Sequence, residues 1–135
     1  MATTLCLIYF AADGVYLTHA GSSKIYQFRD GKIIFKTEDN LIKVSHSPVE
    51  FEIVKITDVL PDDKFFICTN GVTKACNDDD LCGIFSTNQS SEEKINTIKN
   101  KCRTGSRDNY SAYLIPIQEI NKINVFKQIF LYAFA

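Results

Sequence analysis

The segment from residue 24 to residue 39 constrains the fold more than any other part of this sequence. It reads KIYQFRDGKIIFKTED and places Asp30 and Gly31 between two runs rich in β-branched and aromatic residues. A two-residue hairpin turn needs positive φ at both positions, which Asp-Gly tolerates better than most pairs. The segment therefore predicts two antiparallel strands joined by a tight turn.

Further strands are predicted on both sides of this hairpin. TLCLIYFAA at 4–12 and VYLTHAG at 15–21 are rich in β-formers and are separated by an Asp-Gly turn. VEFEIVKI at 49–56 begins with alternating apolar and acidic residues, and KFFICT at 64–69 has the pattern of a buried strand. The first half of the chain is therefore predicted to be mostly antiparallel sheet.

The second half changes to the pattern of helices. Asn77 precedes three aspartates and can cap a short helix whose first turn they occupy. Ser90 and Glu93 form a capping box for a longer helix, and Gly105 is placed to end it. YSAYLIPI at 110–117 returns to the alternation of a strand. The expected fold class is α+β, with mostly antiparallel β-sheets and two or three helices.

The chain has 135 residues and is predicted to be one domain, residues 1–135, with residues 118–135 as an apolar C-terminal tail. The apolar residues of the tail fit helical spacing and also one face of a strand, so both conformations remain open. Its last apolar run is shorter than the ~20 residues that span a bilayer. No membrane association is expected.

The charge and the cysteines narrow the class of protein. Lys and Arg number 15 against 16 Asp and Glu, and no basic cluster of the kind that binds nucleic acid is present. The five cysteines are irregularly spaced and include no CxxC pair, so we expect free thiols in a reducing cytoplasm. No basic residue precedes the apolar start, which predicts a first strand rather than a signal peptide. A cytoplasmic location is therefore expected.

Four sequence pieces occur in a fixed order: TTLCLIYF at 3–10, HAGSSKIYQFRDGKIIFKTEDN at 19–40, DDKFFICTNGV at 62–72 and GSRDNYSAYLIPI at 105–117. In this order they resemble the C-terminal part of metal-dependent protein phosphatases of the 2C (PPM) family. The resemblance covers about residues 3–117. It implies a truncated αββα sandwich, in which a pair of sheets lies between helices, with the N-terminal metal-binding part of the family domain absent.

The resemblance also points to a metal site. In the family, carboxylates hold two Mn²⁺ or Mg²⁺ ions, which activate a water against a phosphoester. Asp108 stands at one metal-ligand position, whereas Asn70 replaces the aspartate of a Ser-Asp-Gly motif and adds no negative charge. Ser22 and Lys24 replace the acid and the arginine of a Gly-Asp-Ser-Arg turn, and Asn40 replaces the histidine of an Asp-His pair. Asp108 and Asn70 are therefore predicted as vestigial metal positions, with no catalytic residue, no cofactor-binding residue and no cofactor.

Two functions follow from this resemblance. The first is a catalytically inactive module, not an enzyme, that acts through protein–protein interaction or homo-oligomerisation, because a partial sandwich leaves apolar sheet or strand edge uncovered. The second is a metal-dependent serine/threonine phosphatase in which a partner chain supplies the missing ligands for Mn²⁺ or Mg²⁺. A third possibility is an accidental resemblance, in which the strands that carry Cys68 and Tyr110 would not be neighbours. A protein partner or a second copy is expected, and neither nucleic acid nor membrane.

Overall fold

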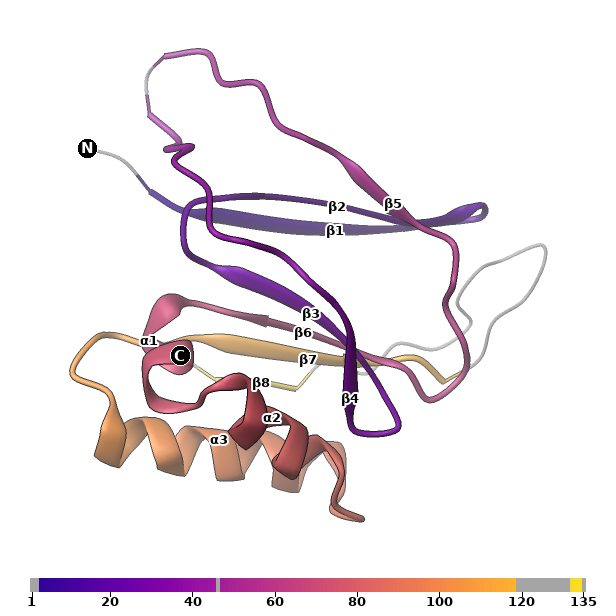
Figure 1. The fold of residues 1–135 in the computed structure, drawn as a ribbon, viewed down its shortest axis with the longest axis vertical. Coiled ribbons are helices and arrows are strands. Elements are labelled where there is room, and N and C mark those ends of the chain that lie inside the picture. Colours follow the sequence, from indigo (N-terminus) through magenta and orange to yellow (C-terminus); the bar gives the residue numbers. More distant parts are fainter. Residues whose placement is uncertain (1–2, 46, 119–131, 135) are drawn as a thin grey trace.

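The computed structural model describes residues 3–45, 47–118 and 132–134. Within these residues the chain forms eight strands and three helices, and the strands make two sheets. Figure 1 shows three layers, with the three-stranded sheet at the top, the five-stranded sheet in the middle and the two longer helices at the bottom.

The two sheets are antiparallel throughout, as the sequence predicts. The small sheet has the spatial order β1 (Leu5–Ala11), β2 (Gly14–Ala20) and β5 (Val54–Ile56). The large sheet has the spatial order β4 (Lys32–Lys36), β3 (Lys24–Arg29), β6 (Lys64–Cys68), β7 (Ala112–Pro116) and β8 (Tyr132–Phe134). The predicted α+β fold class is confirmed.

The helices are α1 (Asn70–Ala75), α2 (Asp78–Phe85) and α3 (Ser91–Gly105). Asn77 caps α2 and Ser90 caps α3, each through the capping box that satisfies backbone N–H groups at the helix start. Both predicted caps are therefore confirmed. None of the described helices is long and apolar enough to cross a membrane. The cytoplasmic location stays a prediction.

Apolar side chains fill the space on both sides of the large sheet. Between the two sheets, the Phe10 ring meets the Phe65 ring edge-on, with centroids 5.8 Å apart. Between the large sheet and the helices, the rings of Phe28 and Phe85 stack with centroids 3.9 Å apart. The described residues place no helix on the outer face of the small sheet (Figure 1). Among the described residues, the large sheet is therefore covered on both faces and the small sheet on one.

The local turns and strands agree with the sequence in most places. Asp30 and Gly31 form the predicted hairpin turn, with φ of 51° and 75°. Of the predicted strand at 49–56, only Val54–Ile56 pairs, as β5. Most of the predicted tail, 118–135, lies outside the described residues, and the part that is described pairs as β8 with β7.

A helix that local sequence patterns do not predict follows β6. This helix is α1, and Asn70 and Gly71 are its first residues. A Cβ built on Gly71 would lie 2.2 Å from the carbonyl oxygen of Asn109, so only glycine allows this close approach. The requirement comes from a segment almost forty residues away, which local sequence patterns do not reveal.

Candidate functional site

Three of the four motif pieces meet at one end of the strands of the large sheet. The register pairs Lys24, which begins β3, with Cys68, which ends β6, and pairs Cys68 with Ala112, which begins β7. Because these strands are antiparallel, the turns attached to these ends lie together at the same end of the strands. Tyr110 stands two residues before β7. The strand that ends at Cys68 and the strand that follows Tyr110 are neighbours, which contradicts an accidental resemblance.

The two predicted metal positions lie close together at this end of the strands. Asn70 is the first residue of α1, and the next residue, Gly71, touches the backbone of Asn109. Asp108 precedes Asn109 and forms an ion pair with Lys74, one turn farther along α1. The Asp108 carboxylate therefore has a cationic partner from within the chain. The sequence does not single out Lys74, because its role depends on the unpredicted helix.

The remaining motif positions bind one another. The side-chain oxygen of Asn40 accepts a hydrogen bond from the Gly21 N–H at 2.7 Å, and its amide group donates to the His19 carbonyl at 3.2 Å. Lys24 pairs with Asp39 at 2.5 Å. These contacts tie the chain after β4 to the turn between β2 and β3. Asn40 and Lys24 therefore act as structural cross-links here.

The described residues do not by themselves fit a dinuclear metal centre. Nowhere in the part of the chain that the structure describes do three His, Cys, Asp or Glu side chains converge. At the predicted position, the one carboxylate is Asp108, which is paired with Lys74, and Asn70 offers an uncharged amide. Ser22 lines a hollow beside Asn40 and adds no charge. Two hard divalent cations need several carboxylates, so a centre here needs ligands from outside the described residues.

A second charged group joins the β3–β4 hairpin to α2. Lys36 donates to Asp78 at 2.8 Å, and the Tyr26 hydroxyl donates to the same carboxylate at 3.2 Å. The hydrogen bond to Asp78 raises the pKa of Lys36, and burial followed by nearby negative charge raises the pKa of Tyr26. Both side chains therefore stay protonated near neutral pH and serve as donors rather than as bases.

The five cysteines are free thiols. Burial raises the pKa of Cys6 to about 11, and burial is also the first cause that raises the pKa of Cys102 to about 11. Burial raises the pKa of Cys68 and Cys76 as well. A nucleophilic cysteine needs a lowered pKa, so these four thiols are not activated, and Cys68, Cys76 and Cys102 are core side chains.

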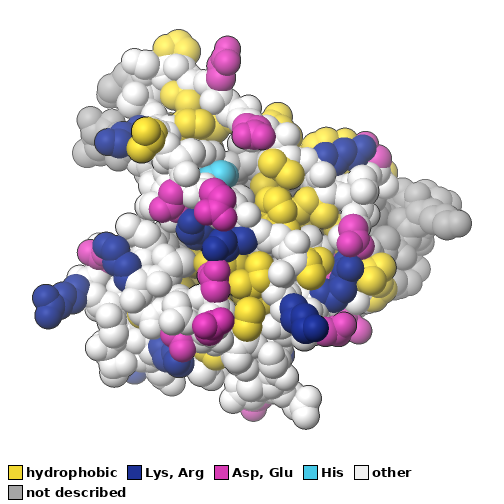
Figure 2. Space-filling view, in the orientation of Figure 1, with side chains coloured by type: hydrophobic (Ala, Val, Ile, Leu, Met, Phe, Trp, Pro, Cys, Tyr) yellow, Lys and Arg dark blue, Asp and Glu magenta, His cyan; other side chains and the backbone are white. Residues whose placement is uncertain are grey.

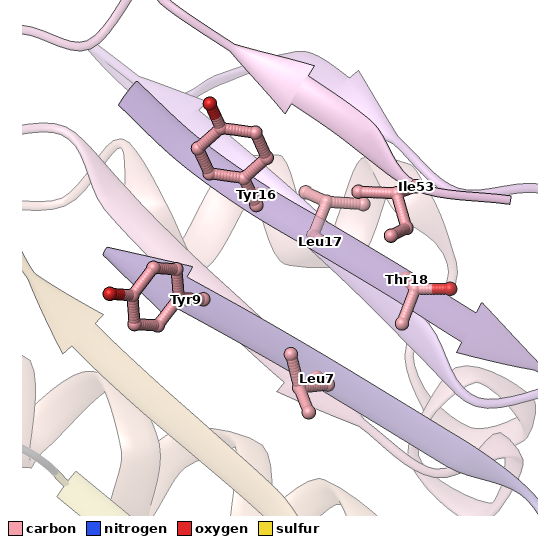
Figure 3. Close-up of a pocket in the computed structure, with 6 residues that line it drawn as sticks. All are labelled: Leu7, Tyr9, Tyr16, Leu17, Thr18 and Ile53. Atoms are coloured by element: carbon pink, nitrogen blue, oxygen red, sulfur yellow. The ribbon is translucent and has the colours of Figure 1, made fainter. Parts of the chain in front are cut away.

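The outer face of the small sheet is a second candidate site. Leu7 and Tyr9 of β1 and Ile53, just before β5, expose 49%, 62% and 68% of their surface. One open hollow is lined by Leu7, Tyr9, Tyr16, Leu17, Thr18 and Ile53 (Figure 3). Hydrophobic side chains also reach the surface at the level of the small sheet in the space-filling view (Figure 2). The uncovered apolar surface that the sequence predicts is therefore located here.

Charged residues border this hollow at the β1–β2 turn. The Tyr16 hydroxyl donates to Asp13 at 2.6 Å, and Lys55 donates to it at 3.0 Å. These two hydrogen bonds, that of Tyr16 first, lower the pKa of Asp13 below its ordinary value. An apolar centre with a polar border is the usual anatomy of a protein–protein interface.

No protein-family model and no curated protein sequence matches this chain. Solved structures do match it. The Mycobacterium tuberculosis serine/threonine phosphatase PstP/Ppp matches with a TM-score of 0.77 and 20% identity, over 88% of this chain and 61% of that one. The S. agalactiae serine/threonine phosphatase matches with a TM-score of 0.73 and 18% identity, over 84% of this chain and 59% of that one.

The fold is that of the 2C-type protein phosphatases. PppA, a regulatory component of T6SS in Pseudomonas aeruginosa, also matches, with a TM-score of 0.72 and 21% identity over 84% of this chain and 56% of that one. The chain spans 56% to 61% of the length of these three structures. The predicted resemblance to part of a 2C-type phosphatase domain is therefore confirmed at the level of the fold.

These neighbours overturn one expectation. The inference that the chain is not an enzyme, but a pseudophosphatase, is wrong, because serine/threonine phosphatases share its fold. The replaced motif positions, Asn70 among them, and the absent N-terminal part are too weak a basis for it, since another polypeptide segment can supply ligands that these residues lack. The assignments of Asp108 and Asn70 as vestigial metal positions, and the expected lack of a cofactor, stay predictions.

Proposed function

We propose that this phosphatase-like module works by binding another polypeptide over the outer face of its small sheet. The unequal covering of the two sheets carries the proposal. Helices α2 and α3 bury the outer face of the large sheet, whereas Leu7, Tyr9 and Ile53 remain exposed on the small sheet. Contiguous exposed apolar surface of this kind marks interaction sites in soluble proteins.

The free energy available at this face favours a partner without guaranteeing tight binding. Complete burial of an apolar side chain contributes about 1.5–3 kcal/mol. Because Leu7, Tyr9 and Ile53 are already partly covered, a partner gains about 1 kcal/mol from each. A total of about 3 kcal/mol corresponds to roughly a hundredfold in affinity. The contact therefore has to extend beyond these three side chains.

The native mass of the chain tests this proposal. We expect the chain, purified gently from its host, to elute as a stoichiometric complex with a second polypeptide. Leu7→Lys places a charge in the apolar face and should dissociate the complex. Leu41→Lys is the matched control, because Leu41 is 97% exposed and lies outside this face. A wild-type monomer, or a complex that survives Leu7→Lys, would contradict the proposal.

A second candidate function is phosphoester hydrolysis by that complex, with the partner supplying carboxylates for Mn²⁺ or Mg²⁺. The proximity of Asn70 and Asp108 within a phosphatase fold favours it. We expect the complex to hydrolyse an aryl phosphate when Mn²⁺ is added, and Asn70→Asp to increase the rate. Asn100→Asp on the exposed side of α3 is the control for added charge. If neither the wild-type complex nor the Asn70→Asp complex hydrolyses the aryl phosphate, this function is rejected.

A further inference from the structure

The edge strands of the described sheets differ in how they are protected. β4 carries Lys32 and Lys36 at its ends, and its register with β3 shifts between Gln27 and Phe28. β5 has only 3 residues, one of which is Lys55. β1 has 7 residues, LCLIYFA, without charge or proline, in unbroken register with β2. Lysines, bulges and short length are the devices that keep edges from pairing, and β1 has none of them.

The large sheet extends beyond this edge of the small sheet. On the β1 side of the small sheet, Phe10 of β1 contacts Phe65 of β6. On the β5 side, Asp58, which follows β5, accepts hydrogen bonds from Gln27 and Arg29 of β3. The small sheet therefore lies over β3 and β6, and it also covers Ile115 of β7, which is buried in one cluster with Val15 of β2. Tyr113, two residues earlier in β7, is 44% exposed, so the large sheet reaches past the β1 edge at this end of β7.

The surface of β7 beside this edge is apolar and open. Tyr113 lies on the same side of β7 as Ile115, which is buried between the sheets, yet 44% of Tyr113 is exposed. Its register partner in β6 is Ile67, which is only partly buried. We call the outer edge of β1 over residues 5–9, together with Tyr113 and Ile67, the β1 shelf. Within the described residues, no strand pairs with this edge.

We propose that the β1 shelf binds an extended β-strand of a partner protein. The backbone of that strand would pair with the outer N–H and C=O groups of β1. Neighbouring strands lie about 4.8 Å apart and stacked sheets about 10 Å apart, so an added strand lies over the Tyr113 end of β7. Apolar side chains at every second position would then cover Tyr113 and Ile67. The proposal rests on the proposed partner binding and specifies the partner as a strand with one apolar face.

The geometry argues against a second copy of the chain at this edge. In a two-fold contact the two β1 strands would pair and join the small sheets side by side. Each large sheet, however, extends past the β1 edge by the Tyr113 end of β7 and by β8. The two large sheets would then occupy the same space. A single strand brings no second layer with it and avoids this clash.

Synthetic peptides test the pairing directly. The probe is a short fluorescent peptide of alternating valine and threonine with a lysine at each end, measured by fluorescence anisotropy. Two further versions carry N-methyl groups on alternate amides, one on each edge of the strand. We expect one methylated version to bind roughly tenfold more weakly and the other to bind like the parent, since only one edge pairs with β1. Equal binding of both, or no binding of the parent peptide, would overturn the proposal.

Variants of the chain locate the peptide. Tyr113→Lys should weaken binding roughly tenfold, because it places a charge beneath the added strand. Ile34→Lys is the matched control, since Ile34 is 42% exposed on β4, at the opposite edge of the same sheet. Tyr113→Phe should bind like the wild type. If Tyr113→Lys and Ile34→Lys weaken peptide binding equally, the effect comes from charge alone and the proposal is overturned.

Hydrogen exchange separates strand addition from other modes of binding. In the free chain, alternate amides of residues 5–9 should exchange fast, and the parent peptide should protect them. Protection already present in the free chain, or binding that leaves these amides unprotected, would overturn the proposal.

The same variants separate this inference from the proposed function. A partner complex that is lost with Leu7→Lys but not with Tyr113→Lys keeps the proposed function and overturns strand addition. Loss of the complex with both variants supports both. Survival of the complex with both variants overturns both.

Discussion

The outer faces of the two sheets have similar chemistry but different surroundings. Beneath α2 and α3, the large sheet presents Phe28 and Phe66, and both rings contact Phe85. The small sheet presents Leu7 and Tyr9 on its outer face, and these side chains remain open to solvent. The strands themselves do not account for the difference. It arises because segments 78–85 and 91–105 return across one sheet only.

This asymmetry gives the two faces different roles. An apolar side chain stabilises the fold only if another part of the chain removes it from water. On the large sheet the helices do so within the chain, and the face becomes core. On the small sheet the same kind of side chain contributes little to folding and remains available for binding. Stability and partner binding should therefore respond to different substitutions.

The largest expected effect is at the covered face. Phe85→Ala removes the ring that stacks on Phe28 and leaves a cavity beneath α2, which should cost about 3–5 kcal/mol of unfolding free energy. Urea denaturation measures this loss. Tyr9→Ala on the open face is the matched aromatic truncation and should cost far less. Similar losses for the two variants would mean that both faces are core.

The next effect concerns the contact that ties the two sheets together. Asp63 accepts hydrogen bonds from Arg29 at 2.9 Å and from Gln27 at 3.0 Å, while Arg29 also binds Asp58, beyond β5. Asp63→Asn removes the charge from this contact and should cost about 2 kcal/mol in urea denaturation at neutral pH. Asp62→Asn, at the exposed neighbouring position, should cost little.

The same carboxyl should make stability depend on pH. Burial alone would raise the pKa of Asp63, but hydrogen bonds from Arg29, the Leu60 N–H and Gln27 outweigh it and hold the pKa below 3.8. A carboxyl with a lowered folded pKa stabilises the fold above its unfolded pKa, and this contribution is lost as pH falls through the folded value. Wild-type stability should therefore drop below about pH 4, and less so in Asp63→Asn. Equal acid sensitivity would show that Asp63 is not the responsible group.

The elements that the sequence predicts correctly carry their signal locally. The Asp30-Gly31 turn, the Asn77 cap and the Ser90 cap each depend on residues within a few positions of one another. The strands at 64–69 and 110–117 are also predicted locally, the first from a short apolar run and the second from alternation. Their existence follows from short-range chemistry that tertiary contacts do not oppose.

The features that sequence patterns miss depend on distant segments. The α1 helix needs Gly71 to pass close to Asn109, and the pairing of Asp108 with Lys74 exists only because α1 forms. Tyr113 has the pattern of an ordinary strand residue, and its exposure follows from where the small sheet ends above β7. The metal positions Asp108 and Asn70 come from resemblance alone. Only the structure shows that these two residues lie close together.

A smaller effect is expected at the start of the helix that covers the large sheet. The Ser90 hydroxyl accepts a hydrogen bond from the Glu93 N–H at 3.2 Å, and the Glu93 carboxylate accepts one from the Ser90 N–H at 2.8 Å. Ser90→Ala should cost about 1 kcal/mol, measured by urea denaturation. Ser91→Ala, one position into the helix, is the control and should be nearly neutral. A neutral Ser90→Ala would mean that packing alone fixes the start of α3.

The smallest expected effect on stability is at Leu7, and it discriminates best between the two faces. Leu7 is 49% exposed, so truncation to Ala removes contacts on one side only and leaves no closed cavity. Leu7→Ala should change the unfolding free energy by less than about 1 kcal/mol in urea denaturation. The same substitution should weaken the partner complex measurably in titration of the purified components. A large loss of stability would show that Leu7 is covered within the chain and would make the small sheet's outer face part of the core.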